Sequence, residues 1–260
     1  MSFRYPIRRR SIRKSIDSHS IFLFFLITLL IFPALSIAGG LYVNEFGTPS
    51  MGTAGAGANA VASDASTSFH NAAGMTRIKG KEVMGTGGLL YSTVKFDADS
   101  DTPVSGGDGG DAGGPAPIIG GFYVHSLSDK WKLGANLITL TGAVLDYDDD
   151  WTGRYLNTEV TLLTLTFYPS VAYRVNDCLS LGGGPQIMYA DLEMKAKVPL
   201  PRNDGKVKID GDDVAYGFSL GALVELSERT RFGVVYQSEI EPDFDGDVKI
   251  SGPGTKEVGS

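Results

Sequence analysis

The sequence predicts an all-β fold, a transmembrane antiparallel β-barrel with a plug at its N-terminal end. Three observations predict it. The chain begins with the pattern of an export signal, long runs from Glu82 onward alternate apolar and polar residues, and the links between these runs alternate between short and long. Alternation with a period of two is the pattern of a strand with two different faces. Because lipid offers no partner to an unpaired sheet edge, an exported all-β membrane protein has to close its sheet into a barrel.

Composition narrows the classes of protein further. The chain has 260 residues, a formal net charge of −7 and a single cysteine, Cys178. One cysteine excludes a framework of disulfides within the chain. The acidic excess argues against nucleic acid as a partner, because binding to phosphates needs a basic face. The 34 glycines exceed the usual share of about 7% and favour tight turns and thin strands.

Residues 1–38 have the layout of a secretory signal peptide. A cationic head that ends at Lys14 precedes an apolar run of 12 residues, 21–32, and the small residues Ser36 and Ala38. Such a run fits the apolar region of a signal peptide and is shorter than the ~20 residues of a membrane-spanning helix. We expect cleavage after Ala38, with an uncleaved anchor as the alternative.

Residues 39–80 form the most distinctive segment of the chain. Small residues dominate it, above all in residues 51–62, and it shows no period of two. A backbone with so few side chains can pack closely against a wall or fold tightly in a confined space. Phe46, Phe69 and Met75 among the glycines favour an ordered plug over a flexible linker, which is the alternative.

The rest of the chain predicts seven strands. They are expected at residues 83–96, 118–125, 133–145, 163–175, 179–198, 214–226 and 231–250. The last run is the clearest, since its even positions from Phe232 to Ile250 are mostly apolar and its odd positions from Gln237 on are polar or charged. In residues 179–198 the alternation changes phase near Ile187, and the preceding Pro185 suggests a β-bulge.

The links between these strands alternate in length. Those at residues 126–132, 176–178 and 227–230 are short, while those at residues 97–117, 146–154 and 199–213 are long and mostly rich in Asp and Gly. Short turns at one end and long loops at the other are typical of outer-membrane barrels. A soluble β-sandwich is the alternative, but most of the runs are 13 to 20 residues long. Strands of soluble proteins usually have about 5–6 residues.

Several blocks of the sequence resemble one family. In the N-terminal segment they are Val43-Asn44-Glu45-Phe46, residues 52–62, Ser63-Asp64-Ala65 and residues 71–77. Along the strands they are residues 151–155, 169–173, 216–222 and 236–240, with Phe244 and Gly246. In this order they look like the N-terminal hatch and the barrel of the FadL/TodX family, outer-membrane transporters for long-chain fatty acids and aromatic hydrocarbons. The similarity covers nearly all of residues 40–250.

Two departures from the family pattern matter. Ala72 stands where the family usually has the proline of Asn-Pro-Ala, so this turn lacks the rigidity that a proline gives. Family members form fourteen-stranded barrels with a terminal aromatic residue, whereas this chain ends at Ser260 after about seven strands. We therefore interpret it as the N-terminal half of a transporter, either a fragment or a truncated gene product. Residues 39–80 would be its hatch and residues 81–260 a partial barrel.

The resemblance implies the uptake of hydrophobic compounds, which are captured in an apolar pocket and leave sideways through the barrel wall. In the family this exit is associated with a kink in the third strand, where Gly142 looks like the kink glycine. The alternative is that Gly142 is one more glycine of a thin wall. The other candidate residues of the substrate path or hatch are Asn44, Glu45, Phe46, Asn71 and Gly74. The implied partners are hydrophobic small molecules and the lipid of a Gram-negative outer membrane, without nucleic acid, and the full-length protein is expected to be a monomer.

Other functions have weaker support in the sequence. A general diffusion porin is the main alternative, although a plug serves no purpose in a sieve, and a structural or adhesive barrel is the third. No Ser/His signature for catalysis surrounds His70 or His125, so we expect no enzyme activity. The acidic loops, such as residues 146–150, offer oxygen ligands for Ca²⁺ but lack the spacing of an EF-hand. We expect neither a cofactor nor a metal.

Overall fold

The computed structural model describes residues 47–99, 101–102, 104–201, 203–252 and 255–258. The predicted signal peptide, its cleavage site and the candidates Asn44, Glu45 and Phe46 lie outside these residues. Among the residues described, no helix is long and apolar enough to cross a membrane.

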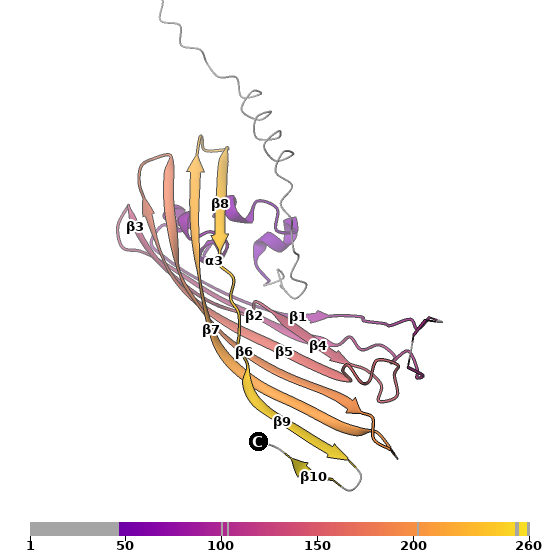
Figure 1. Cartoon of the computed structure of the whole chain (residues 1–260). Helices are drawn as coiled ribbons and strands as arrows, with labels where there is room; N and C mark the ends of the chain where they lie inside the picture. The colour runs from indigo at the N-terminus through magenta and orange to yellow at the C-terminus, as the bar shows by residue number, and fades with distance from the viewer. Residues whose placement is uncertain (1–46, 100, 103, 202, 253–254, 259–260) are drawn as a thin grey trace, which may run out of the picture. The chain divides into compact units, whose positions relative to one another are not determined.

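A single antiparallel sheet makes up most of the described chain (Figure 1). Its strands are β1 (Lys81–Tyr91), β2 (Pro115–Ser126), β3 (Trp131–Ile138), β4 (Gly142–Asp146), β5 (Glu159–Arg174), β6 (Leu179–Val198), β7 (Gly205–Glu225), β8 (Arg231–Gln237), β9 (Asp245–Gly252) and β10 (Thr255–Val258). The order across the sheet is β1-β2-β3-β5-β6-β7-β9-β10, with β4 on β5 and β8 on β7. Because β3 with β4, and β8 with β9, occupy the place of one strand each, β1–β9 form seven spans of a curled half-barrel, which confirms the predicted fold class.

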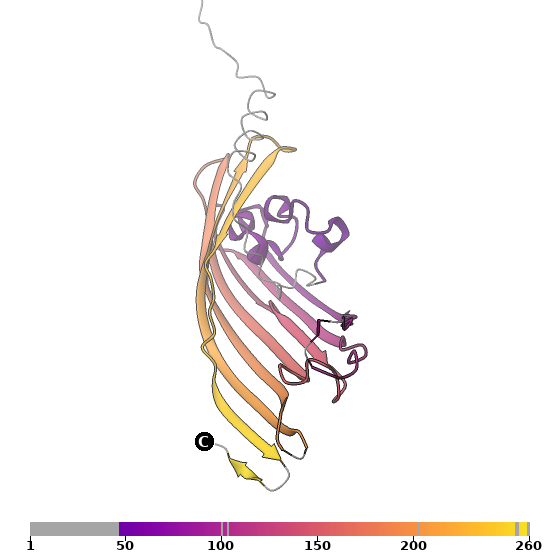
Figure 2. The same ribbon diagram turned by 45° about the vertical axis from the view of Figure 1, so that its right-hand side comes forward.

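The sheet has a turn end and a loop end. Short turns follow β2, β5 and β7, while the long links of residues 92–114 and 147–158 lie at the opposite end. Figure 2 shows the N-terminal helices on the concave side of the sheet, near the turn end. We call this concave side the inner face and the opposite side the outer face.

Toward the turn end, the outer face is apolar and the inner face is largely polar. Exposed apolar side chains line the outer face of every span, among them Val83, Ile119, Tyr123, Leu133, Leu137, Phe167, Val171, Leu181, Leu220 and Val234. The alternate positions on the inner face include buried Asn136, Thr166, Ser170, Ser180, Gln186 and Ser219. This arrangement is the reverse of a soluble protein and is the one that a lipid-facing wall requires.

The third predicted strand, residues 133–145, is not continuous. It divides into β3 and β4 at residues 139–141. The Thr141 amide there donates to the Thr164 hydroxyl oxygen at 2.8 Å, in place of a backbone carbonyl. A side chain that takes over a ladder bond interrupts the regular pairing of the strand.

The predicted strand of residues 231–250 is also divided, into β8 and β9. Val234 of β8 pairs with Ala222, whereas Val248 of β9 pairs with Ile209, and the two ladders with β7 differ by one residue in register. A shift of one residue moves every side chain to the opposite face of a sheet. The apolar even-numbered positions therefore face outward in β8 and inward in β9.

The β-bulge predicted near Ile187 is wrong. The β6–β7 register runs without a shift from Leu179↔Val224 to Val198↔Gly205. Pairing is interrupted only toward β5, between the pairs Phe167↔Ile187 and Val171↔Gly183. The register places two prolines, at positions 169 and 185, opposite each other in this interruption, and neither has an N–H to donate. Because β7 begins at residue 205, the link predicted at residues 199–213 is also shorter than expected.

Candidate functional site

The described part of the N-terminal segment, residues 47–80, contains short helical turns and no strand. They are η1 (Pro49–Thr53), α2 (Ala58–Val61), α3 (Thr67–His70) and η2 (Ala72–Arg77). Ala54 and Ala62 end the first two in the left-handed conformation. These reversals keep the turns short, so the segment folds back on itself against the inner face.

Four wall glycines make room for this segment. Gly134, Gly182, Gly221 and Gly233 lie on the inner face of β3, β6, β7 and β8. A methyl group built on each would come closer than 3.0 Å to the segment: to Met75, to the backbone of Ala72 and Ala73, to Asn71 and to the backbone of Asn59, respectively. Real side chains almost never approach so closely, so the absence of a side chain on the wall is what allows this contact.

Asn71, a candidate from the sequence, fastens the segment to the wall. Its side chain is buried; its oxygen accepts a bond from the Ala73 amide at 3.1 Å. Its Nδ2 donates to the carbonyl oxygens of Asn59 at 2.8 Å and Ala222 of β7 at 3.1 Å. One amide side chain thus caps η2, ties it to α2 and bonds to the barrel strand.

Gly74, the second candidate in the segment, has a packing role. A methyl group there would overlap the side chains of Thr67 and Ala62. Nearby, the Thr76 hydroxyl donates to the Ser180 hydroxyl of β6 at 2.8 Å. Arg77 forms an ion pair with Glu225 of β7. The structure therefore places Asn71 and Gly74 at the contact between the segment and the wall.

A hollow of about 620 Å³ lies between the segment and β8. Its walls include Met51, Phe69, His70, Val235 and Gln237. Burial lowers the pKa of His70, and the nearby Asp64 carboxylate opposes this shift without cancelling it. A neutral imidazole beside Phe69 and Met51 gives a mixed, mainly uncharged lining at neutral pH.

Toward the loop end, the inner face becomes apolar. The register places Leu162 of β5, Leu192 and Met194 of β6, Val207 and Ile209 of β7, and Val248 and Ile250 of β9 on it. The sequence predictions missed this inner apolar wall. A signal for it exists, because the alternation of polar and apolar residues reverses phase within both β6 and β7.

Gly142, the third candidate from the sequence, is the first residue of β4, directly after the break in the third span. β4 pairs with β5 alone, and no ladder joins it to β2 among the described residues. The nearest atoms to a methyl group at Gly142 would be the Leu162 carbonyl oxygen at 3.8 Å and the Leu163 Cδ2 at 3.9 Å. Toward β2 the next backbone bond of this strand is the one from the Asp146 amide to the Ala112 carbonyl at 2.9 Å, so the wall has no ladder at Gly142 and has room for a side chain there.

The β2 edge that faces this break carries two prolines. Ile119 and Thr139 form the last bonded pair between β2 and the third span, with the Thr139 amide donating to the Ile119 carbonyl at 3.1 Å. In an antiparallel ladder, every second residue points its N–H toward the same neighbour. Pro115 and Pro117 have the same parity as Ile119, so the two donors that would face β4 are missing.

A depression of about 440 Å³ lies on the outer face between β2 and β5, at the break in the third span and next to the seam between β2 and β4. It is lined by Pro117, Ile119, Thr139, Leu163, Thr164, Leu165, Tyr189 and Asp191. Most of these side chains are apolar, and Ile119 and Tyr189 belong to the exposed apolar surface of the outer face.

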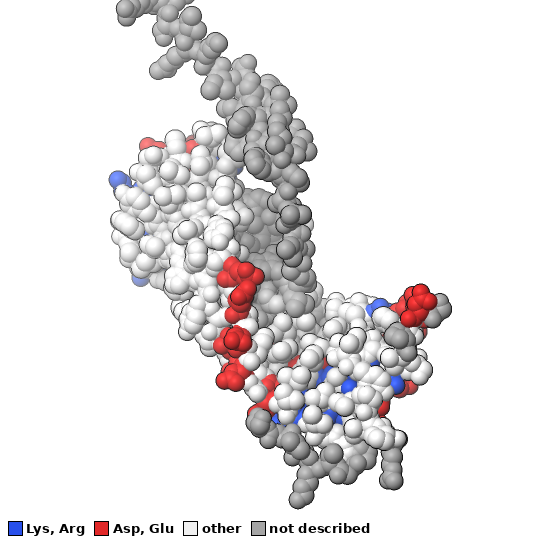
Figure 3. All heavy atoms as spheres, in the orientation of Figure 1, with Lys and Arg blue, Asp and Glu red and all other residues white. Residues whose placement is uncertain are grey.

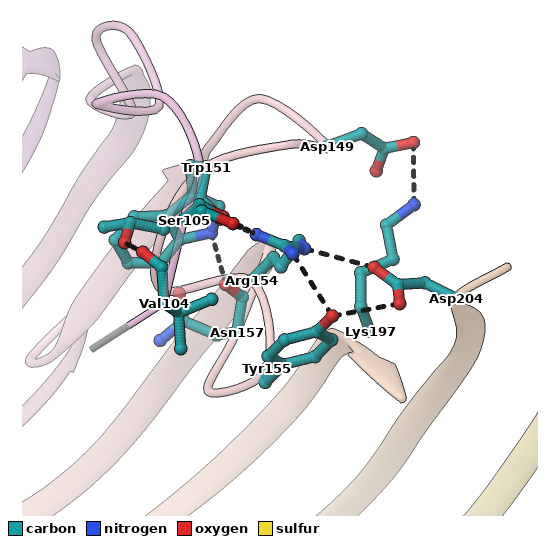
Figure 4. A network of polar contacts seen from close by, with 10 residues as sticks. Val104, Ser105, Asp149, Trp151, Arg154, Tyr155, Asn157, Lys197 and Asp204 are labelled. Carbon is teal, nitrogen blue, oxygen red and sulfur yellow. Dashed lines mark hydrogen bonds and ion pairs between the residues drawn. The ribbon is translucent and has the colours of Figure 1, made fainter. Parts of the chain in front are cut away.

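Arg154 ties the two long links and the shorter link of residues 199–204 together at the loop end (Figure 4). Its Nε donates to Asp204 at 3.1 Å, and its Nη1 donates to the carbonyls of Ser105 at 2.8 Å and Trp151 at 3.1 Å. Tyr155 completes the group, because its hydroxyl donates to Asp204 at 3.0 Å. The Arg154 guanidinium lowers the pKa of Asp204, so this carboxylate stays charged under neutral and mildly acidic conditions.

We call this group of contacts around Arg154, Tyr155 and Asp204 the loop clasp. Trp151 is its apolar centre. Its ring stacks on Tyr147 with centroids 3.9 Å apart, meets Phe96 edge to face at 5.7 Å, and donates its Nε1–H to the Asn157 carbonyl at 2.7 Å. Residues 151–155 stand out in the sequence as a block, but their partner Asp204 lies on a different loop and was not predicted.

Comparisons with known proteins match this architecture. A family model described as "Outer membrane protein transport protein (OMPP1/FadL/TodX)" matches residues 30–258. The long-chain fatty acid transport protein of Escherichia coli O6:H1 is 25% identical over 240 residues, which cover 82% of this chain and 53% of that protein. The 47 kDa outer membrane protein of Pasteurella multocida is 28% identical, over 80% of this chain and 51% of that protein. The chain spans about half the length of the curated relatives it matches.

Two solved structures share the fold. A FadL homologue of Pseudomonas aeruginosa superimposes with a TM-score of 0.68 at 22% identity, over 82% of this chain and 56% of that one. The toluene transporter TodX of Pseudomonas putida superimposes with a TM-score of 0.56 at 17% identity, over 75% of this chain and 56% of that one.

Proposed function

The chain belongs to the outer membrane protein transport family OMPP1/FadL/TodX, and from this membership we propose that it serves the uptake of hydrophobic compounds. It is a protein of the Gram-negative outer membrane, as the names of its relatives indicate. One relative is named as a long-chain fatty acid transport protein, and one structural neighbour is a toluene transporter. Long-chain fatty acids or aromatic hydrocarbons are therefore the substrates that we propose. We propose no catalytic role and a monomeric full-length protein.

The proposed organisation has residues 1–38 as signal peptide, 39–80 as hatch and 81–260 as part of the barrel. The four wall glycines and the bonds of Asn71 support a hatch that rests inside the barrel. In this scheme Asn44, Glu45 and Phe46 belong to the hatch near the substrate path. Asn71 and Gly74 hold the hatch in place rather than touch the substrate.

One apolar region and one mixed, mainly uncharged region of the inner face support capture of a hydrophobic substrate. The inner apolar wall at the loop end offers a surface for first contact, and the hollow beside Met51 and Phe69 lies further along the same face. Burial of each methylene group contributes about 0.8 kcal/mol, so a long acyl chain gains several kcal/mol from such surfaces. Neither region provides the open polar passage of a diffusion porin.

The seam between β2 and β4 is the observation that carries a lateral exit. A substrate with an apolar chain gains nothing from an aqueous pore but gains free energy in the bilayer. The seam has no ladder bonds, lacks two donors on its proline edge, and opens onto an apolar depression of the lipid-facing outer face. We propose that the substrate leaves the barrel here, beside Gly142.

The test is uptake by cells that express Gly142→Tyr, which adds bulk to the outer face at the seam. We expect uptake of a labelled long-chain fatty acid and of toluene to fall about tenfold or more, while binding to the purified protein is retained, because the wall is blocked but the capture surfaces are not. The matched control is Gly85→Tyr, which also lies on the outer face in open space but in the intact β1–β2 ladder. Surface levels of both variants are compared by labelling.

Each other outcome is informative. Normal uptake by Gly142→Tyr at normal surface level would contradict the lateral exit. Equal loss of binding and uptake in that variant alone would mean that the seam contributes to capture instead. Normal entry of a small polar solute that depends on this protein would favour the diffusion porin.

A further inference from the structure

We call the exposed apolar side chains of the outer face the apolar belt. Toward the loop end from this belt, the outer face carries rows of charged residues, and the charges within each row have the same sign. Across β6, β7 and β9, the register aligns Asp191, Asp212 and Asp245 in one row and Glu193, Asp210 and Asp247 in the next. The following rows, nearer the loop end, are Lys195, Lys208 and Lys249, and then Lys197 and Lys206. We call these five lysines the lysine band. Blue spheres gather over the loop ends of these strands in Figure 3.

The lysine band is on the side that faces the membrane but lies beyond its apolar interior. Lys195 shares the outer face with Tyr189, the last aromatic residue of the belt on β6. Lys195 lies six positions further along the strand, which is roughly 20 Å at ~3.3 Å per residue. A tilt of about 40° reduces this to roughly 15 Å in height. With the long loops outside the cell, the band lies at the level of the sugars and phosphates of the outer-leaflet glycolipid.

Like charges directly opposite on neighbouring strands repel each other, so the band requires anions between its rows. The chain itself supplies several of them, and one bridges two lysines. Asp149 places one carboxylate oxygen 2.9 Å from Lys197 Nζ and 3.7 Å from Lys206 Nζ, which bridges the outermost row. This bridge shows the geometry in which the band accepts an oxyanion.

The next row is paired less evenly. Lys195 Nζ lies 2.6 Å from Glu159 Oε2 and 3.0 Å from Glu193 Oε1. Lys249 Nζ lies farther from its partners, 3.9 Å from Asp210 Oδ1 and 4.0 Å from Asp247 Oδ2. The side chains of Lys206 and Lys249 are 67% and 50% exposed. Between the rows lies a hollow of about 400 Å³, lined by all five lysines together with the carboxylates of Asp146, Asp149 and Glu159. It has room for a tetrahedral anion beside the loosely paired ammonium groups.

We propose that the lysine band binds phosphate groups on the sugars of the outer-leaflet glycolipid. Lys206, Lys208 and Lys249 supply the donors that line the hollow. Lys208 Nζ is also held by Glu193 at 2.8 Å, and the ion pairs of Lys195 and Lys197 hold the edges of the site in place. A phosphate oxygen would bridge neighbouring lysines as the Asp149 oxygen does. Charge-assisted bonds from two or three ammonium groups to one phosphate suit this arrangement.

The experiment compares binding of rough lipopolysaccharide in detergent micelles to the purified chain and to the triple variant Lys206→Gln, Lys208→Gln, Lys249→Gln. We expect the variant to bind about tenfold more weakly or worse, and the wild type to lose affinity at high salt. The triple variant with Arg at the same positions keeps the charge and should bind as the wild type does. The matched control is Lys79→Gln, Lys81→Gln, Lys130→Gln, which removes three exposed lysines near the turn end and should change nothing.

Two further arms decide the ligand chemistry. The same lipopolysaccharide after removal of its phosphates should bind the wild type as weakly as native lipopolysaccharide binds the Gln variant. Inorganic phosphate should compete only at far higher concentration, since it lacks the acyl chains that dock on the belt. Equal affinity of the wild type and the Gln variant, or no effect of phosphate removal, would overturn the proposal. So would unfolding of the Arg variant, which would assign the lysines a structural role.

Discussion

The turn end and the loop end of the sheet are built from the same strands but have opposite faces. In the turn-end half of β7, Leu220 faces outward and Gly221 faces Asn71 of the N-terminal segment, the proposed hatch, whereas in the loop-end half Asp212 faces outward and Ile209 inward. The backbone register of β6 and β7 is continuous between the halves. The surroundings, lipid and hatch at one end and water and an apolar lumen at the other, therefore decide which residues each face carries.

A positive charge on the outer face should separate the two halves most strongly. Leu220→Arg places a guanidinium in the apolar belt and should cost about 2–4 kcal/mol of folding free energy at the middle of the membrane. Asp212→Arg, on the same face of the same strand, should change stability by only about 0.5 kcal/mol or less. The measurement is equilibrium unfolding by urea in lipid vesicles. Similar costs at both sites would refute the boundary that we draw between the halves.

The inner face of the turn-end half can be tested through its glycines. Gly182→Leu forces a side chain into the backbone of Ala72 and Ala73 and should destabilise the hatch by about 1–3 kcal/mol. Limited proteolysis should then cut residues 47–80 faster while the strands stay protected. Gly88→Leu is the control, because it lies on the same face with no atom within 4 Å. An unchanged cleavage rate in Gly182→Leu would mean that the hatch does not rest on the wall in solution.

The loop clasp should respond to acid, with the smallest effect of the three. The bond from Arg154 lowers the pKa of Asp204 below its usual value of 3.8, so the clasp is fully stabilised above that pH and weakens as the pH falls through the lower pKa of the folded state. Protease sensitivity of residues 97–114 should therefore increase only at pH values below about 3.8. An acid-stable protease such as pepsin reports this change. Asp204→Asn should be equally sensitive at all these pH values; a wild-type profile in that variant would exclude Asp204 as the titrating group.

The sequence predicted the fold because alternation depends on only one strand at a time. It was misleading where two different structural causes produce the same alternation pattern in the sequence. The phase change near Ile187 suggested a bulge, but the register of β6 is regular and the polarity of the surroundings changes instead. In residues 231–250 the opposite occurred: an almost unbroken alternation hid a real shift of register, because the outward phase of β8 and the inward phase of β9 look alike in the sequence.

Residues of the candidate site could be predicted only where a single sequence position was enough to identify them. Gly142 was selected in the third span because it resembles the kink glycine of the family; in the structure it is the first residue of β4, and its role in the exit stays a proposal. The proline edge of β2 and the Arg154–Asp204 contact could not be found in this way, because each depends on which strand or loop lies next to it. The four wall glycines were hidden among 34 glycines of one chain, and only the contacts of the hatch distinguish them.

The proline edge at the seam also has a consequence for how the wall behaves over time. A gap that depends on a moving strand opens and closes with that strand, at a rate set by the bonds it breaks and re-forms. Pro115 and Pro117 have no amide hydrogen, so β4 cannot form a regular hydrogen-bonded ladder with this edge, however it moves. The discontinuity is therefore fixed by the covalent structure of the two prolines. It is present without any trigger, and neither cooling nor a bound ligand can restore the missing hydrogen bonds.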